Sequence, residues 1–538
     1  MSIRRIVVWM SVLALVFALG MTGCGPAEDE IVDDDDEPVD DPTDTPEQIL
    51  RVALRADIQD FDPVYLEDAP TSGVAFQIYE HLVARDFDGT LMEGLAEDWE
   101  ASEDAMVWTF HLREGVKFHD GSDFTAEVVK FHYERIMDPD TGSHAMESFR
   151  RNIKRIDAID DLTLEIELHE PNAAFIDQVI ITNAGYIPSM EAVKELGDDL
   201  AHNPVGTGPF KFNEWVPDTR VVLDRYEDYW KGPAKLEQVI FRPIPETGTQ
   251  MAELRTGGIH IMTTVPPEHL ETLQADDEIV VLTEPDFNIR YLVYNMNNPL
   301  FQDVRVRQAL NHAVDVENLV GEFLRGVADK AVGPFAIQSW AHDPNVPQFE
   351  YDPDRAEELL EEAGWTRGDD GMFQKDGQTL NFTLSTPVGR YTKDQEVCEA
   401  VHYQLRQFGI DVELEPLEFA TLIDKLSERE YDLGYIGFMT RSGEPAAMPD
   451  HLYMSGGWAN WGDYSNEEVD ALMDAGRATA DFDERREIYS QAQELIALDA
   501  PIIPIMNEYY MLAHRAELEG YEFSAARTMD YTNIEIVD

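Results

Sequence analysis

The stretch LAEDWEASEDAMVWTFHLREGVKFHDGSDFTAEVV, from Leu95 to Val129, decides the fold. In its middle, residues 107–113 alternate apolar and polar side chains, and this period of two predicts a half-buried strand. The large apolar side chains that would share the buried face are Trp108, Phe110 and Leu112. Farther on, Thr125 can cap a helix that ends before Pro139. The stretch therefore predicts a strand followed by a helix.

Strand and helix signals alternate on both sides of this stretch. Residues 162–168 (LTLEIEL) predict another half-buried strand. Asp303 predicts the start of one long amphipathic helix that reaches Phe323, and Ser465 with Glu468 has the spacing of a capping box. Together these signals indicate an α/β body with a mixed-sheet insertion.

The N-terminal segment predicts export and lipid attachment. Two arginines precede an apolar run from Ile6 to Gly20, and Met-Thr-Gly-Cys24 follows, which is the pattern of a secretory signal with a lipobox. The apolar run is too short to favour a spanning helix. Residues 1–23 would be removed, and Cys24 would carry the lipid. The alternative is an uncleaved N-terminal anchor, which would also place the rest of the chain outside the membrane.

The chain is strongly acidic, with 107 acidic and 40 basic residues and a net charge of −67. Such a surface should repel nucleic acid and anionic lipid, and it suits a saline or alkaline exterior. Residues 24–48 are rich in Asp, Glu and Pro and predict a disordered, extended tether. With Cys24 lipidated, only Cys398 remains, so we expect no intramolecular disulfide.

Catalytic and cofactor motifs are missing from the sequence. It has no His-Glu-x-x-His, no Gly-x-Ser-x-Gly and no Cys-x-x-Cys, and Gly206-Thr-Gly208 lacks the third glycine of a dinucleotide loop. His119-Asp120 lies in a turn, where a hydrogen-bonded structural pair is favoured over a metal ligand. We therefore predict a protein that is not an enzyme and that has neither a cofactor nor a metal site.

Four groups of residues together resemble one protein family. They are Leu95–Val129, residues 203–215 (NPVGTGPFKFNEW), residues 226–230 with 241–245 (YEDYW and FRPIP), and residues 301–314 (FQDVRVRQALNHAV). They resemble the extracytoplasmic solute-binding proteins, family 5, of peptide-type ABC importers, which include dipeptide, oligopeptide, glutathione and nickel-complex binders. The first stretch is similar to the family's signature segment nearly residue for residue. The resemblance covers essentially the whole mature chain, and its motifs are mainly structural.

The resemblance implies a bilobed, periplasmic-binding-protein-like α/β fold of class II, of the large peptide-binding type, with an extra mixed α/β domain. Such a protein closes over its ligand about a hinge, and an ABC permease reads the closed form. The implied boundaries are 49–80, 203–287 and 509–538 for lobe I, 81–202 for the extra domain, and 288–508 for lobe II.

A second stretch, YDLGYIGFMTRSGEP from Tyr431 to Pro445, concerns the ligand. Its apolar run predicts a buried strand, and Arg441 at the end of that strand needs an anionic partner. The alternative to a ligand contact is a guanidinium that snorkels or pairs with a nearby carboxylate. In the peptide binders that this stretch resembles, an aspartate that pairs with the ligand's α-ammonium stands at this position. The inverted sign disfavours a peptide N-terminus beside Arg441.

The resemblance implies further ligand-binding positions. Arg390 and Tyr391 match an element that presents an arginine and a tyrosine to a peptide carboxylate. Phe419 and Phe438 match aromatic positions of the cleft wall, with ordinary core packing as the alternative. Glu67 matches a first-lobe loop that runs along the bound peptide, and it could supply the ammonium partner that position 441 lacks.

The remaining candidate ligand residues surround Arg441 in the sequence. They are Thr440, Ser442, Gly443 and Glu444. Residues 441–444 (RSGE) are similar to the Ser-Thr-Gly-Glu of glutathione binders, although that match does not explain the arginine. Glu444 is a second candidate for the ammonium partner.

The predicted function is that of a lipid-anchored solute receptor on the outer face of the cytoplasmic membrane, at the cell surface or in the periplasm. We expect a monomer that binds a short peptide or peptide-like acid and delivers it to ABC permease subunits. A glutathione-like ligand is favoured, because two cleft arginines suit two carboxylates. The alternatives are a binder of a nickel–organic acid complex, an exported hydrolase, and an adhesive or chaperone-like surface protein.

Overall fold

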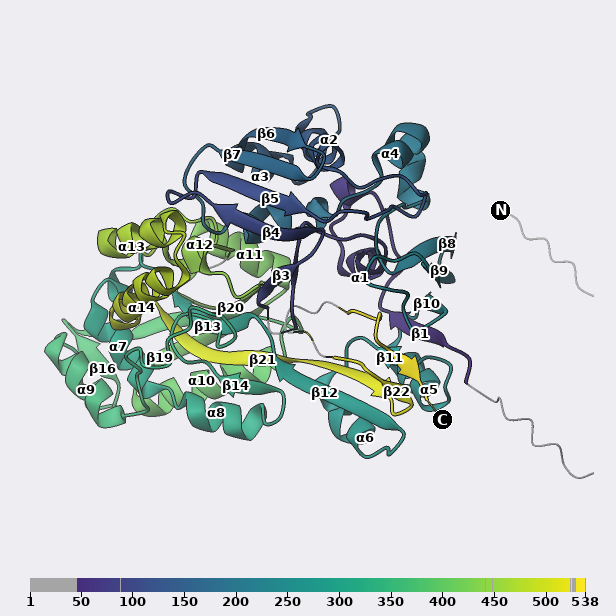
Figure 1. Cartoon of the computed structure of the whole chain (residues 1–538). Helices are drawn as coiled ribbons and strands as arrows, with labels where there is room; N and C mark the ends of the chain where they lie inside the picture. The colour runs from purple at the N-terminus through teal and green to yellow at the C-terminus, as the bar shows by residue number, and fades with distance from the viewer. Residues whose placement is uncertain are drawn as a thin grey trace, which may run out of the picture. The chain divides into compact units, whose positions relative to one another are not determined.

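The computed structural model describes residues 46–87, 89–440, 442–447, 449–522, 524 and 529–537 (Figure 1). The predicted signal peptide, the lipid site Cys24 and most of the predicted tether lie outside these residues, as does Arg441. Within the described ranges, every helix is too short or too polar to cross a bilayer.

Strands from distant parts of the chain build one mixed sheet. Its spatial order is β19 (Asp411–Leu417), β18 (Asn381–Pro387), β20 (Leu433–Met439), β13 (Asn288–Tyr294), β21 (Ile502–Arg515), β11 (Ile261–Met262), β1 (Ile49–Leu54), β10 (Gln238–Pro243), β9 (Arg220–Arg225) and β8 (Phe210–Val216). Every residue of β13 is buried. Its alternate side chains enter two different apolar clusters, with Leu292 in one and Tyr291 in the other. The sheet is therefore covered on both faces at β13.

Strand β21 serves two parts of this sheet. Its residue Ile503 lies opposite Leu292 of β13, whereas Met511 lies opposite Thr283 of β12 (Ile279–Pro285). The short strand β14 (Ala328–Lys330) also pairs with β21. Figure 1 shows β21 as the long yellow strand that runs from beside β13 to beside β12. A single strand thus links the β13 part of the sheet to the β11 and β12 part.

The deciding stretch forms a separate antiparallel sheet. Its order is β4 (Ala96–Ala101), β5 (Val107–Leu112), β7 (Thr163–Leu168) and β6 (Ile153–Asp160). The predicted inner face of β5 is confirmed, because Trp108, Phe110 and Leu112 are all buried. They share an apolar cluster with residues of α2 (Ala126–Met137). Thr125 is the N-cap of α2 as predicted, but its side chain makes no capping hydrogen bond.

The prediction of one long helix after Asp303 is wrong. The structure has α7 (Val304–Ala313) and α8 (Val316–Phe323), separated by a short break. Asp315 causes the break, because its side chain accepts a hydrogen bond from the backbone N–H of Asn318 (3.0 Å) and so caps a second helix. Phe323, predicted on the buried side, is 41% exposed.

The predicted capping box at Ser465 is displaced by one residue. The N-cap of α13 (Glu467–Ala478) is Asn466, whose side chain accepts from the backbone N–H of Glu468 (2.9 Å). Ser465 instead forms a hydrogen bond with Ser455 (2.8 Å between the hydroxyl oxygens). Asn is as good a cap as Ser, so the sequence pattern did not distinguish the two positions.

The described residues form further helices, some packed on the sheets and others on neighbouring helices. They are α1 (Ala69–Ile78), α3 (Met146–Asn152), α4 (Met190–Leu196), α5 (Thr247–Arg255), α6 (Leu270–Gln274), α9 (Pro353–Glu362), α10 (Asp394–Phe408), α11 (Phe419–Glu428), α12 (Pro449–Tyr453) and α14 (Phe482–Asp499). The remaining strands are short: β2 (Val83–Arg85), β3 (Leu91–Glu93), β15 (Thr366–Arg367), β16 (Phe373–Lys375), β17 (Gln378–Thr379), β22 (Leu518–Glu519) and β23 (Glu535–Ile536).

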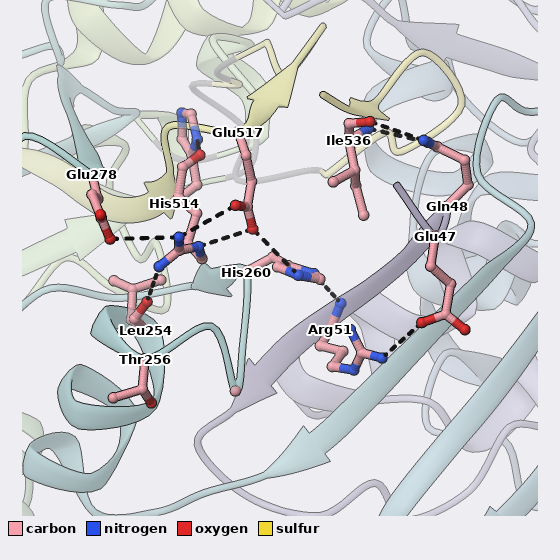
Figure 2. Close-up of polar contacts among 12 residues, drawn as sticks. Glu47, Gln48, Arg51, Leu254, Thr256, His260, Glu278, His514, Glu517 and Ile536 are labelled. Atoms are coloured by element: carbon pink, nitrogen blue, oxygen red, sulfur yellow. Dashed lines mark hydrogen bonds and ion pairs between the residues drawn. The ribbon is translucent and has the colours of Figure 1, made fainter. Parts of the chain in front are cut away.

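The start of the described chain is bound to its C-terminal strand (Figure 2). Gln48 Nε2 donates to the carbonyl of Ile536 (2.9 Å), and Gln48 Oε1 accepts from its N–H (3.1 Å). Gln48 thus belongs to the folded body rather than to the predicted tether. Nearby, the N–H of Arg51 donates to His260 Nδ1 (3.0 Å). Burial lowers the pKa of His260 to about 4, although Glu517 opposes the shift, so the ring is neutral and can accept.

The His119-Asp120 turn is structural, as predicted, but the two side chains bind other groups. His119 Nε2 lies 2.9 Å from the carbonyl of Gly208, and His119 Nδ1 accepts from the N–H of Gly206 (3.4 Å). Asp120 accepts from the hydroxyl of Ser189 (2.6 Å). Burial lowers the pKa of His119 to about 4. The histidine therefore fastens the Gly-Thr-Gly turn as a neutral ring.

Candidate functional site

Strand β20 confirms the buried strand predicted in the stretch from Tyr431, and one of its glycines is required by sterics. Gly437 lies opposite Arg290 of β13. A Cβ atom on Gly437 would lie 2.2 Å from Arg290 Cδ, which is well inside van der Waals contact. The missing side chain at position 437 therefore leaves the space that the arginine side chain occupies.

Arg290 is the charged residue of the buried strand β13, and the sequence patterns used above did not single it out. Its guanidinium pairs with Glu508, donates from Nη1 to the carbonyl of Phe438 (3.4 Å) and lies 4.3 Å from the ring centre of Tyr391. Burial lowers the pKa of Arg290, but Glu508 and nearby tyrosines outweigh it and raise the pKa overall. The arginine in NIRYLVY (288–294) was a usable signal, because arginine is rarely buried without a partner.

The segment that carries Arg390 and Tyr391 is fixed by one buried carboxylate. Asp394, at the start of α10, accepts from the N–H groups of Gly389 (3.1 Å), Arg390 (2.7 Å) and Tyr391 (3.1 Å). Three backbone donors that converge on one carboxylate restrict the conformation of this turn. The sequence around Asp394 gives no sign that this residue organises the turn.

Three of the predicted ligand residues, Arg390, Tyr391 and Phe419, meet at this turn. The hydroxyl of Tyr391 accepts from the N–H of Gly437 (3.2 Å) and lies 3.3 Å from its carbonyl, so Tyr391 is joined to β20 next to Phe438. The side chain of Arg390 lies over the ring of Phe419, with 4.6 Å from Cζ to the ring centre. Arg390 is exposed, whereas Tyr391 is half-buried. This arrangement presents a positioned guanidinium and an aromatic surface to solvent.

The other face of the β20 end is also aromatic. The ring of Phe438 packs edge-on against the indole of Trp458, with 5.6 Å between the ring centres. Trp458 is 61% exposed, and the sequence analysis did not select it. An indole is seldom this exposed, since it has a large apolar surface, so Trp458 extends the aromatic surface available to a ligand.

The loop that follows β20 is held by its own backbone and by distant polar groups. The N–H of Thr440 donates to the carbonyl of Phe287 (2.9 Å), and its hydroxyl donates to the carbonyl of Ser442. The carbonyl of Gly443 accepts from the hydroxyl of Ser339 (2.5 Å). Thr440 is half-buried and Ser442 is buried.

Glu444 is buried and paired. Its Oε1 lies 2.6 Å from Arg485 Nη2, and it also accepts from the N–H of Ala446 (3.2 Å). A small cavity of about 20 Å³ adjoins it and is lined by Phe438, Thr440, Ser442, Gly443 and Glu444. The cavity has room for about one water molecule. The role of Glu444 as ammonium partner stays a prediction, and in the structure its carboxylate already binds an arginine.

Glu67 lies apart from these loops. It precedes α1, its side chain is exposed, and its Oε1 is 3.4 Å from His144 Nδ1. Among the contacts of the described residues, none connects Glu67 with Arg390, Phe419 or the loop after β20. Its proposed role in the site therefore stays a prediction that the contacts do not address.

A larger polar cavity adjoins the loop at residues 444–447. It has a volume of about 700 Å³ and is lined by residues from 148–178 on one side and from 446–478 on the other. Gln178 Nε2 donates to the carbonyl of Ala446 (2.8 Å) at its edge. The charged side chains in its wall are of both signs: Arg151, Glu170, Asp177, Asp474 and Arg477.

Replacing Asp450 in α12 by asparagine is expected to stabilise the protein at pH 8. Within the described structure neither carboxylate oxygen has a hydrogen-bond partner, and Arg477 Nε is 3.6 Å from Oδ2. Burial raises the pKa of Asp450 to about 7, although Arg477 opposes the shift. Because folding favours the protonated carboxyl, its contribution to stability is lost as the pH rises from about 4 through 7.

The expected gain for Asp450→Asn is about 2–4 kcal/mol in the free energy of unfolding at pH 8, and it should fall to about a quarter of that at pH 4.5. Urea unfolding at both pH values measures it. Asp474→Asn is the matched control, because Asp474 also pairs with Arg477 but is exposed. A loss of stability in Asp450→Asn at pH 8 would show that the buried carboxylate does not destabilise the protein at this pH.

The geometry places an exposed arginine over an aromatic ring, an arrangement that is chemically able to bind an anionic group. Comparison with known proteins shows which family the chain belongs to. The sequence profile "Bacterial extracellular solute-binding proteins, family 5 Middle" matches residues 90–460. The glutathione-binding protein GsiB of Pectobacterium atrosepticum is 30% identical over 480 residues, which cover 87% of this chain and 90% of the relative.

Solved structures are similar over nearly the whole chain. The periplasmic binding protein DppA from Helicobacter pylori, in complex with the peptide STSA, is 29% identical with a TM-score of 0.69, covering 91% of this chain and 98% of the other. A nickel ABC transporter protein from Bacillus halodurans is 27% identical with a TM-score of 0.79, covering 91% and 100%. This chain belongs to the bacterial extracellular solute-binding proteins, family 5. The predicted bilobed α/β fold is confirmed as the fold of this family.

Proposed function

We propose that this chain is the substrate-binding component of an ABC importer and that it captures a short peptide or peptide-like anionic solute, with glutathione favoured. The ligand binds between lobe I (49–80, 203–287 and 509–538) and lobe II (288–508), with 81–202 as the extra domain. The protein acts as a monomer and changes no covalent bond of the ligand. Closure over the solute presents it to the permease subunits.

The observation that carries this proposal is the position of Arg390. Its backbone is fixed by Asp394, and its exposed guanidinium lies over the ring of Phe419 (4.6 Å). An arginine that is already ordered loses little conformational entropy when it binds a carboxylate in a bidentate manner. Similarity to glutathione-binding proteins over 87% of the chain supports a ligand with two carboxylates and one ammonium group.

Isothermal titration calorimetry with purified protein tests the ligand class. Glutathione is expected to bind with one saturable site, and a nickel–histidine complex is the competing ligand. Saturable binding of the nickel complex and not of glutathione would instead favour a binder of a nickel–organic acid complex. The similarity to a nickel ABC transporter protein supports this alternative. Glutathione that is released from the protein after binding is expected to be intact when it is measured by mass spectrometry. Cleaved glutathione or cleaved peptides would show an exported hydrolase instead.

Arg441→Asp is expected to weaken binding of glutathione. The change removes a charge-assisted contact and adds a repulsion to the ligand carboxylate, so the loss should be about 1.5–3 kcal/mol or more in binding free energy. Arg355→Asp is the control, because Arg355 pairs with exposed glutamates on α9. Unchanged affinity in Arg441→Asp, measured by calorimetry, would remove Arg441 from the site.

We also propose that Cys24 carries a lipid that anchors the chain to the outer face of the cytoplasmic membrane. The support is the lipobox before Cys24 and the acidic tether after it. Cys24→Ala is expected to move the protein from the membrane fraction to the soluble fraction. Continued tight membrane association of this variant in cell fractionation would contradict a lipid anchor.

A further inference from the structure

Glu508 lies where two chain segments pass from one part of the main sheet to the other. On β21 it is opposite Ala328 of β14, and two residues later Tyr510 is opposite Glu284 of β12. The second passage is short, because β12 ends at Pro285 and β13 begins at Asn288. We refer to these two passages, residues 286–287 and 507–508, as the crossover.

The crossover is held together by an amide side chain. Asn288 Nδ2 donates to the carbonyl of Glu508 (2.7 Å), and Asn288 Oδ1 accepts from the N–H of Glu508 (2.7 Å). Asn507 Nδ2 in turn donates to the carbonyl of Asn288. All three residues are buried. These hydrogen bonds tie the backbone of Glu508 to the start of β13.

The carboxylate of Glu508 reaches from the crossover to the ligand-binding turn. Its Oε2 binds the guanidinium of Arg290, and its Oε1 accepts from the N–H of Thr392 (2.9 Å). Thr392 follows Tyr391, whose ring lies against the guanidinium of Arg290 (4.3 Å to the ring centre). Glu508 thus contacts the backbone of the turn that carries Arg390, and Arg290 contacts the ring of Tyr391 in the same turn.

Stability alone is a weak reason for such an arrangement. A buried ion pair costs desolvation that its attraction barely offsets, and an apolar pair of similar volume is often as stable. The geometry instead restricts the turn. Asp394 and Glu508 together accept hydrogen bonds from the backbone N–H groups of four consecutive residues, 389–392.

We infer that Arg290 and Glu508 are positioning residues, which make the orientation of the ligand-reading Arg390 depend on the geometry of the crossover. This inference rests on the proposed function, because it takes Arg390 to bind a ligand carboxylate. Coupling of this kind is reciprocal: a ligand that holds Arg390 also favours one arrangement of the two crossover passages. The ion pair thereby connects binding to the strands that join the two parts of the sheet.

A double-mutant cycle between Glu508→Gln and Arg390→Gln tests this inference, with the dissociation constant for glutathione from calorimetry. Glu508→Gln keeps an acceptor for Thr392 but weakens the partner of Arg290. Alone it is expected to raise the dissociation constant about tenfold. In the Arg390→Gln background it should change the constant less than about twofold, because the positioned group is gone. Two independent, additive losses would overturn the inference, as would unchanged binding in Glu508→Gln.

Two further variants separate positioning from general destabilisation. Glu253→Gln weakens the Arg242–Glu253 pair, which joins α5 to β10, and it should leave the dissociation constant unchanged. Arg290→Lys keeps a charge for Glu508 but loses the planar contact with Tyr391, so its loss of affinity should also vanish in Arg390→Gln. This variant serves if Glu508→Gln does not fold.

Hydrogen–deuterium exchange of the unliganded protein tests the positioning role of Glu508 without any ligand. In Glu508→Gln, the amides of residues 389–394 are expected to exchange faster, and those around Glu253 should not change. If glutathione does not bind the unmodified protein, the proposed function fails, and faster exchange in this turn still supports the positioning role. Unchanged exchange in the turn would overturn it.

Discussion

Gly437→Ala is expected to lower the free energy of unfolding by about 2–4 kcal/mol, because the new methyl group occupies space that belongs to a buried arginine. Its Cβ would lie 2.2 Å from Arg290 Cδ and 2.4 Å from Nη1. These atoms are in the middle and at the head of a side chain that is packed under Tyr391 and paired with Glu508. The arginine cannot move aside without separating from its partner, which would leave a buried carboxylate unpaired.

Urea unfolding of the unmodified protein and of the variants below measures this effect. Gly321→Ala is the matched control, because a Cβ at Gly321 in α8 meets no atom within 4 Å. In that helix alanine should stabilise by about 0.5–1 kcal/mol. The loss in Gly437→Ala should also largely disappear in an Arg290→Ala background, where the space is free. Equal stability of Gly437→Ala and the unmodified protein would show that Arg290 can leave its site at no cost.

Arg485→Met is expected to lower the free energy of unfolding by about 3–5 kcal/mol, because it leaves Glu444 buried without a counter-charge. Arg485 is itself buried, and its Nε donates to the carbonyl of Gly476 (2.9 Å). Its guanidinium also lies 5.0 Å from the ring centre of Trp340. Methionine keeps much of the apolar contact, so the expected loss comes chiefly from the unpaired carboxylate.

The charge argument predicts a partial rescue. Adding Glu444→Gln to Arg485→Met removes the unpaired carboxylate and should restore more than half of the lost stability. Arg355→Met is the control, since the ion pairs of Arg355 are exposed and should contribute less than about 1 kcal/mol. If chemical denaturation finds the double variant less stable than Arg485→Met, the loss has a cause other than the buried charge.

Hydrophobic periodicity and capping patterns predicted helices and strands where one face of the element is buried. The strand at 107–112 and the strand after Tyr431 form as expected, because their apolar residues alternate or run continuously. The break at Asp315 was missed, since the apolar spacing continues through it and only the capping hydrogen bond reveals a new helix. Local patterns therefore predicted the elements better than their ends.

The predicted ligand residues Arg390, Tyr391 and Phe419 lie together in the structure, and Tyr391 is joined to β20 beside Phe438. Their binding of a ligand stays a prediction, and the residues that support them were not predicted. Their supports, Arg290 and Glu508, are 218 positions apart in sequence. A single sequence carries no record of such a pairing, because only the register of β13 with β21 brings the two residues together.

Because β21 pairs with strands in both parts of the main sheet, it affects when the chain can fold during synthesis. The strand that completes both parts of the main sheet lies close to the C-terminus, at residues 502–515. Neither part can close its hydrogen-bond ladder before these residues have been synthesised, and pairing over such long sequence separations is slow. A nascent chain with this topology stays incompletely folded until residues 502–515 have been made, which suits an extracytoplasmic protein that folds after it crosses the membrane.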